Sequence, residues 1–289
     1  MISRIVVQIV VFLVLLTTGQ SEEKWQLDPE IRAKCLSVLR EGFRGDEFWP
    51  SMHAAEALTI GGQGQEVEDY LAPKLSAEKD DQRRCGMARE LVRSGDLTKS
   101  SVMMDILLKE DPHGHVHAAE SLYKVGWSGN SNPLKKAYAE RDNIRLKLMA
   151  AAALAKYNKG EPGKAAIAFL RQYLEEEPDP TLFRLAAWVL SRIGGDSDRD
   201  LIRSRLKDAD DPLVYAFLEH ALAALGDADG KAALLRNLKS DDPAIRTYAS
   251  VFAGEFGIYE AIPDLLISLD DENLDAGIRA AQALLTLAR

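Results

Sequence analysis

The sequence contains no segment of alternating polar and apolar residues long enough to form a β-strand. Its apolar residues recur instead at the three- and four-residue spacings of helices that bury one face. This pattern predicts an all-α protein.

Cysteine is scarce, because Cys35 and Cys85 are the only two in the chain. We place them on helices that belong to different structural units. A disulfide would require their Cα atoms to come within about 7 Å of each other. Two buried free thiols are the favoured interpretation, and a disulfide in an oxidising compartment is the alternative.

Positive charge is not in excess. The chain has 36 Lys and Arg against 45 Asp and Glu, and its formal net charge is −9. A nucleic-acid partner requires a basic face that neutralises phosphates, and an anionic membrane surface attracts basic proteins. The acidic balance therefore argues against both kinds of partner.

A long hydrophobic run is also lacking. The apolar stretch 5–16 is interrupted by Gln8, preceded by Arg4 and followed by Thr17 and Gly19. A spanning helix needs about 20 apolar residues, whereas this layout is typical of a signal peptide cleaved after Gly19. We therefore expect an exported protein, periplasmic or secreted, that meets a membrane only if the signal segment stays uncleaved.

Motifs of catalysis are missing as well. No glycine-rich phosphate loop follows a strand, no nucleophile elbow occurs, and no paired cysteines form a metal motif. The sequence accordingly predicts no catalytic residue and no cofactor.

What the chain does contain is a repeat. Residues 53–58 read HAAEAL, residues 117–122 read HAAESL, and residues 86–91 between them read GMAREL, a degraded copy. The copies define a period of roughly 32 residues, which is typical of a solenoid of stacked helical hairpins.

The repeat divides the chain into segments. After the signal peptide at 1–19, residues 20–45 form a linker and a capping helix, which Asp28 and Pro29 begin. The repeat domain then occupies 46–289. Its helix pairs are expected at about 46–80, 81–112, 113–143, 144–180, 181–212, 213–243 and 244–273, before a half unit that ends at Arg289.

The later units carry a family resemblance. Asp242 and Pro243, then Gly257 and the segment 261–266, resemble the HEAT-like repeat of the phycobilisome-lyase type, and Asp211 with Pro212 begins another unit of this kind. The resemblance implies a right-handed α-α superhelix, HEAT- or armadillo-like, of about seven hairpins with terminal caps.

Enzymes occur within this repeat class. Deoxyhypusine hydroxylase, a HEAT-like enzyme, binds two irons through adjacent His-Glu pairs in its first helices, whereas this chain contains no His-Glu dipeptide. Aligned on the repeat, Met52 with His53 and Val116 with His117 stand at those positions, so neither metal pair transfers. Phycobilin lyases offer no motif that can be carried over.

The candidate site is an HxxE pattern used twice, His53 with Glu56 and His117 with Glu120. Positions i and i+3 are neighbours on a helix, so each pair can share one local site. Units one and three of an open stack lie nearly 20 Å apart, since helices within a layer pack about 8–10 Å from each other. One metal ion could therefore reach all four side chains only if the superhelix closed sharply.

Three interpretations of these residues remain open. The histidines are half-buried and hydrogen-bonded to the glutamates of their own helices, or a metal site uses His53, Glu56, His117 and Glu120, or a polar groove crosses units one to three. The equivalent column in units four to seven, Met149, Leu185, Phe217 and Tyr248, suggests buried packing. The groove would comprise Trp49, His53, Glu56, Arg84, Arg89, His115, His117 and Glu120.

The sequence thus favours an exported HEAT-repeat scaffold that binds a protein partner, or another ligand, through the polar face of its first three units. The alternative is a metal-dependent HEAT-repeat enzyme that uses the HxxE pairs. A minor hypothesis is carbohydrate binding, with Trp49 and Trp127 as stacking platforms.

Overall fold

A computed structural model describes residues 25–126 and 131–289 of the chain. In these two ranges every regular element is a helix, which confirms the predicted all-α, HEAT-like solenoid class. The expected signal peptide at 1–19 and the aromatic platform Trp127 lie outside the described residues.

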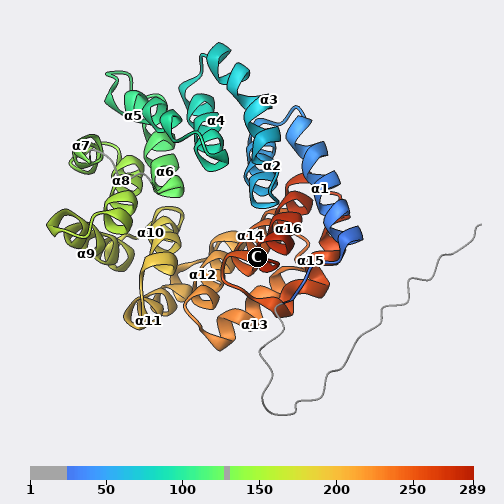
Figure 1. Ribbon diagram of the computed structural model, residues 1–289. Coiled ribbons are helices and arrows are strands. Elements are labelled where there is room, and N and C mark those ends of the chain that lie inside the picture. The colour runs from blue at the N-terminus through green and yellow to red at the C-terminus, as the bar shows by residue number, and fades with distance from the viewer. Residues whose placement is uncertain (1–24, 127–130) are drawn as a thin grey trace, which may run out of the picture.

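The helices form two concentric layers (Figure 1). The inner layer consists of α2 (Phe48–Ile60), α4 (Asp81–Ser94), α6 (His115–Val125), α8 (Ile144–Tyr157), α10 (Pro180–Ile193), α12 (Pro212–Ala224), α14 (Pro243–Glu255) and α16 (Leu274–Leu287). The outer layer consists of α1 (Pro29–Arg44), α3 (Gly64–Ala77), α5 (Ser100–Leu108), α7 (Asn132–Tyr138), α9 (Glu161–Glu176), α11 (Asp196–Arg205), α13 (Ala228–Asn237) and α15 (Ile262–Ser268).

Capping residues set the starts of the helices. The Asp28 carboxylate accepts a hydrogen bond from the backbone N–H of Glu30 at 2.7 Å and begins α1, as predicted. Asp211 caps α12 and Asp242 caps α14 in the same way, each followed by proline at the first helical position. Because each inner helix is reached through an antiparallel outer helix, the inner helices all run in the same direction.

Small residues on the inner helices allow close packing between them. A Cβ atom at Gly254 on α14 would lie only 2.6 Å from the Cα of Ala283 on α16. The adjacent Ala253 and Ala280 are fully buried. This close approach brings successive inner helices together and narrows the space that they surround.

The stack closes on itself. Helix α16 packs against α14 and also against α2, while α1 packs against both α16 and α2 (Figure 1). The sequence suggested a cap at one end and a lone helix at the other, but these two helices meet and complete a ring. The driving force is apolar burial, since an open stack would expose Leu284 of α16 and Leu39 of α1, which are fully buried here.

The two cysteines are separate, buried thiols. Burial raises the pKa of Cys35 on α1 to about 11 and that of Cys85 on α4 to about 12. Thiols with such pKa values are protonated and unreactive at neutral pH, so both behave as core residues.

Candidate ligand-binding cavity

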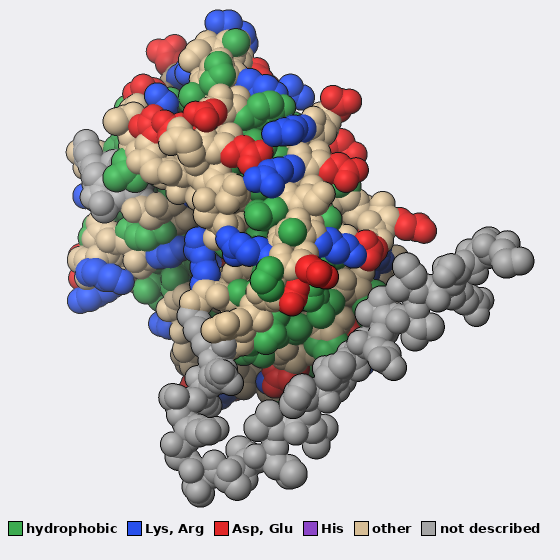
Figure 2. All heavy atoms as spheres, turned by 45° about the vertical axis from the view of Figure 1, so that its right-hand side comes forward, with side chains coloured by type: hydrophobic (Ala, Val, Ile, Leu, Met, Phe, Trp, Pro, Cys, Tyr) green, Lys and Arg blue, Asp and Glu red, His purple; other side chains and the backbone are tan. Residues whose placement is uncertain are grey.

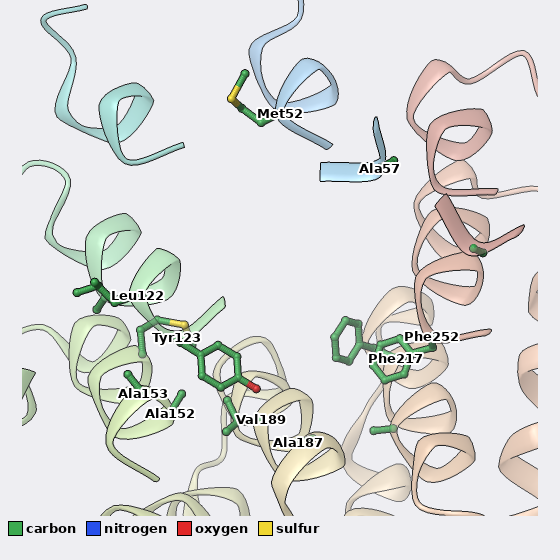
Figure 3. Close-up of a cluster of buried hydrophobic side chains, with 14 of the residues drawn as sticks. Met52, Ala57, Leu122, Tyr123, Ala152, Ala153, Ala187, Val189, Phe217 and Phe252 are labelled. Carbon is green, nitrogen blue, oxygen red and sulfur yellow. The ribbon is translucent and has the colours of Figure 1, made fainter. Parts of the chain in front are cut away.

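The inner helices surround a cavity of about 900 Å³, to which every inner helix contributes side chains. Figure 3 shows Tyr123 from α6 on one side of this space and Phe217 and Phe252 from α12 and α14 on the other. A volume of this size falls within the usual range for sites that enclose most of a small ligand or a short peptide segment.

The face of the repeat that points into the cavity is the column identified by the sequence. Met149, Leu185, Phe217 and Tyr248 all line it. The sequence suggested that this column packs in the core. In the structure the column is partly core and partly cavity surface. Phe217 is only 5% exposed, whereas Tyr248 is 36% exposed.

His53 on α2 contacts Asp275 on α16, with 2.7 Å between its Nδ1 and the Asp275 Oδ1. Burial, together with the nearby positive charge of Arg279, lowers the pKa of His53 to about 4. The imidazole is therefore neutral at pH 7, and its Nδ1–H donates to the carboxylate. The expected partner, Glu56 of the same helix, is not the residue that His53 contacts.

Glu56 instead forms ion pairs with the inner helices on both sides of α2. Its carboxylate lies 2.8 Å from Arg93 on α4 and 3.2 Å from Arg279 on α16. Burial alone would raise the pKa of Glu56, but these two guanidinium groups hold it well below its usual range. Arg93 also contacts Glu90 at 2.8 Å, so the network joins α2, α4 and α16.

The second HxxE pair is also separated. The His117 ring stacks on Trp49 with 5.2 Å between the ring centroids and an interplanar angle of 16°. Glu120 pairs with Lys124, one helical turn further along α6, at 2.6 Å. Burial opposes ionisation of Glu120, but Lys124 and Arg89 lower its pKa to about 2. Trp49 thus brings units one and three into contact, although the sequence-based estimate placed them nearly 20 Å apart.

The remaining groove candidates do not line the cavity. Arg89 is buried behind it, with its Nε 2.6 Å from Glu90. Arg84 pairs with Asp81 at 2.8 Å, and the Nε2 of His115 is buried without a hydrogen-bond partner. Of the expected groove, His53, Glu56, His117 and Glu120 line the cavity, and Trp49 adjoins it through His117.

The described residues also bear on the metal alternative. Within 25–126 and 131–289, no three His, Cys, Asp or Glu side chains lie close enough together to hold a metal ion. The HxxE side chains are engaged instead with Asp275, Arg93, Arg279, Trp49 and Lys124. The geometry therefore gives no support to metal binding by these four residues.

The cavity wall has more basic than acidic side chains, unlike the chain as a whole. It contains seven Lys and Arg against five Asp and Glu, in a protein of net charge −9. The outer face shown in Figure 2 has both signs interspersed. The basic members are Arg93, Lys124, Arg145, Lys156, Arg184, Arg192 and Arg279, and the acidic members are Glu47, Glu56, Glu120, Glu255 and Asp275.

Three of these cations form no ion pair with any described residue: Arg145, Lys156 and Arg184. Lys156 lies over the Tyr123 ring, 4.6 Å from its centroid, and Arg184 lies 5.7 Å from the centroid of Phe217. Burial and the neighbouring Arg192 lower the pKa of Lys156. These aromatic contacts position the cations without neutralising them.

These three residues were not among the site residues expected from the sequence. A signal was available, since Arg145 and Lys156 are three helical turns apart, and Arg184, Trp188 and Arg192 follow each other at four-residue intervals. Both spacings place the side chains on one face of a helix. Nothing local to the sequence indicated that this face is the inner one.

Among the described residues, no helix has the length and hydrophobicity needed to cross a membrane.

Comparison with known proteins supports the repeat class. Residues 131–223 match the family of HEAT repeats. Human deoxyhypusine hydroxylase, solved in complex with glycerol, is similar at 14% identity and a TM-score of 0.41, over 90% of this chain and 97% of that one. An engineered protein is similar at 15% identity and a TM-score of 0.27, over 88% and 96% of the two chains. No curated protein shows significant sequence similarity. The family match over residues 131–223 and the stacked helical hairpins of the described residues together support a HEAT-like repeat fold.

Proposed function

We propose that the protein is a non-catalytic binding protein that holds a segment of a partner protein in its central cavity. The observation that carries this proposal is the combination of unpaired cations and partly exposed aromatic rings on the wall of one enclosed space. Cations and aromatic side chains are the groups that contribute most to recognition of protein segments.

The two sides of the cavity have different roles in this proposal. The polar side chains of units one to three are paired with one another and with Arg279 of α16, so they shape the wall and hold the ring closed. The side chains of α8, α10 and α14 keep free cationic and aromatic groups, which can contact a ligand. The polar face expected for units one to three would therefore be one wall of a larger site.

A peptide library tests the proposal. Random octapeptides are selected against the wild-type protein, against Tyr248→Ala and against Tyr259→Ala. The two tyrosines are 36% and 45% exposed, but only Tyr248 lines the cavity. We expect wild type and Tyr259→Ala to select the same peptides, and Tyr248→Ala to bind them about tenfold more weakly.

Circular dichroism and the melting temperature establish that both variants are folded. Failure to select any peptide with wild type, or equal binding by Tyr248→Ala, would exclude the cavity as a peptide site.

The carbohydrate hypothesis has less support. One face of the Trp49 ring is covered by the stacked His117. A sugar platform needs an accessible aromatic face, so only the other side of Trp49 could serve.

We also propose that binding takes place after export, on the basis of the apolar segment 5–16 and the small residues that follow it. In a secreting host, mass spectrometry should find a mature N-terminus at Gln20 outside the cytoplasm, and Val11→Arg should keep the chain uncleaved inside. Wild-type protein that retains its leader in the cytoplasm would refute export.

A further inference from the structure

We infer that the cavity selects a peptide segment with acidic residues at both ends of a short apolar stretch. This inference rests on the proposed function, because it assumes that the cavity is the peptide site. It goes further by assigning the chemistry of the segment, which follows from where the unneutralised cations lie.

Arg145, Lys156 and Arg184 line the cavity and have no carboxylate partner among the described residues, whereas Arg93, Lys124 and Arg279 on the same wall are all paired. Lys156 and Arg184 are partly buried, whereas Arg145 is exposed. A partly buried cation is poorly hydrated, so a carboxylate that reaches it forms a charge-assisted hydrogen bond at little additional desolvation cost. These three unpaired cations therefore favour an anionic ligand.

The unpaired cations lie near the two ends of the helices that carry them. Arg145 is the second residue of α8, and Lys156 is the second residue from its end. The two are eleven residues apart, and a helix rises about 1.5 Å per residue, so they lie about 16 Å apart on one face. Arg184 lies near the start of α10, which runs parallel to α8. Two cations thus mark one end of the cavity and one cation marks the other.

The cavity wall between the cations is apolar. On α8 the intervening cavity residue is Met149, and on α10 the side chains Leu185 and Trp188 follow Arg184. Phe217 and Tyr248 continue this apolar surface on α12 and α14. An extended chain rises about 3.3 Å per residue, so about five residues span the 16 Å between the cationic ends.

The unpaired cations, their spacing and the apolar wall between them define a segment of about five residues with the order acidic, apolar, acidic. Nucleic acid does not fit, because a chain of net charge −9 repels a polyphosphate and offers no extended basic face. A small dicarboxylate also carries two carboxylates separated by an apolar stretch. Titration with a dicarboxylate beside the peptides distinguishes the two kinds of ligand.

Isothermal titration calorimetry with the full chain tests the inference. The probes are the acetylated, amidated peptides Glu-Leu-Trp-Leu-Glu and Gln-Leu-Trp-Leu-Gln, and dodecanedioate. We expect the glutamate peptide to bind at least tenfold more tightly than the glutamine peptide. Lys156→Gln and Arg184→Gln should each weaken binding of the glutamate peptide three- to tenfold and leave the glutamine peptide unchanged.

Lys136→Gln provides the matched control, since it removes the same charge from an exposed position on the outer helix α7. Equal binding of the two peptides, or an equal loss in Lys136→Gln, would overturn the inference. Binding of dodecanedioate without binding of the glutamate peptide would overturn its assignment to a peptide. If library selection yields peptides without acidic residues, the inference fails while the proposed function stands, and if it yields none, the proposed function fails.

Discussion

The described histidines differ in what surrounds them. His53 stays neutral because burial and the nearby Arg279 lower its pKa, although its contact with Asp275 acts in the opposite direction. His220 on α12 is fully buried. The Nε2 of His220 accepts a hydrogen bond from Asn237 at 3.1 Å, while its Nδ1 has no partner. Burial lowers the pKa of His220 to about 3. By contrast, the exposed His113 has its pKa raised by a hydrogen bond to Asp80.

This difference predicts a pH dependence of stability. Folded His220 stays neutral until about pH 3, whereas in the unfolded chain it takes up a proton below about pH 6.5. The unfolded state therefore binds more protons in this window, and the free energy of unfolding falls as the pH is lowered. His220→Phe should reduce that fall by up to about 1.4 kcal/mol per pH unit between pH 6 and 4.

Urea unfolding of wild type and variant at several pH values measures this slope. His113→Gln serves as the control, because a group whose folded pKa is raised contributes in the opposite direction. A slope in His220→Phe equal to that of wild type would show that His220 is not held neutral by the fold.

At the scale of the element, the inner helices are defined by caps and by small residues. Aspartates set where the helices start, and alanines and glycines set how closely they approach. The limits of the helices were predictable because capping and turn residues act locally. The distance between a particular pair of helices, such as α14 and α16, was not predictable, because it depends on the residues of both helices.

Gly254→Ala tests the close contact between these two helices. Within an isolated helix, alanine is more stable than glycine by about 1 kcal/mol. Here the added Cβ would meet the Ala283 backbone at 2.6 Å, so the helices must separate. We expect a net loss of about 1–3 kcal/mol in the free energy of unfolding.

Gly195→Ala is the matched control, because a Cβ there meets nothing within 4 Å. Chemical denaturation of both variants gives the comparison. Stabilisation by Gly254→Ala would mean that α14 and α16 are less tightly packed than described.

At the scale of the whole molecule, ring closure decides the function that the chain can have. The contacts His53 with Asp275 and Glu56 with Arg279 join the first inner helix to the last. His53 and Glu56, which the sequence suggested as metal ligands, are engaged in these contacts. Because the ring closes, the inner faces of α8 and α10, which carry the unpaired cations, become part of the cavity wall.

The sequence by itself determined the class of fold and the capping aspartates, because each of these depends on residues within one turn or one hairpin. Four of the site residues that it offered, His53, Glu56, His117 and Glu120, line the cavity. Only the tertiary structure decided that the stack closes, that α1 and α16 meet, and which partners His53 and Glu56 contact. The physical reason is that closure accumulates from a small rotation at each repeat, and no local pattern of residues records that sum.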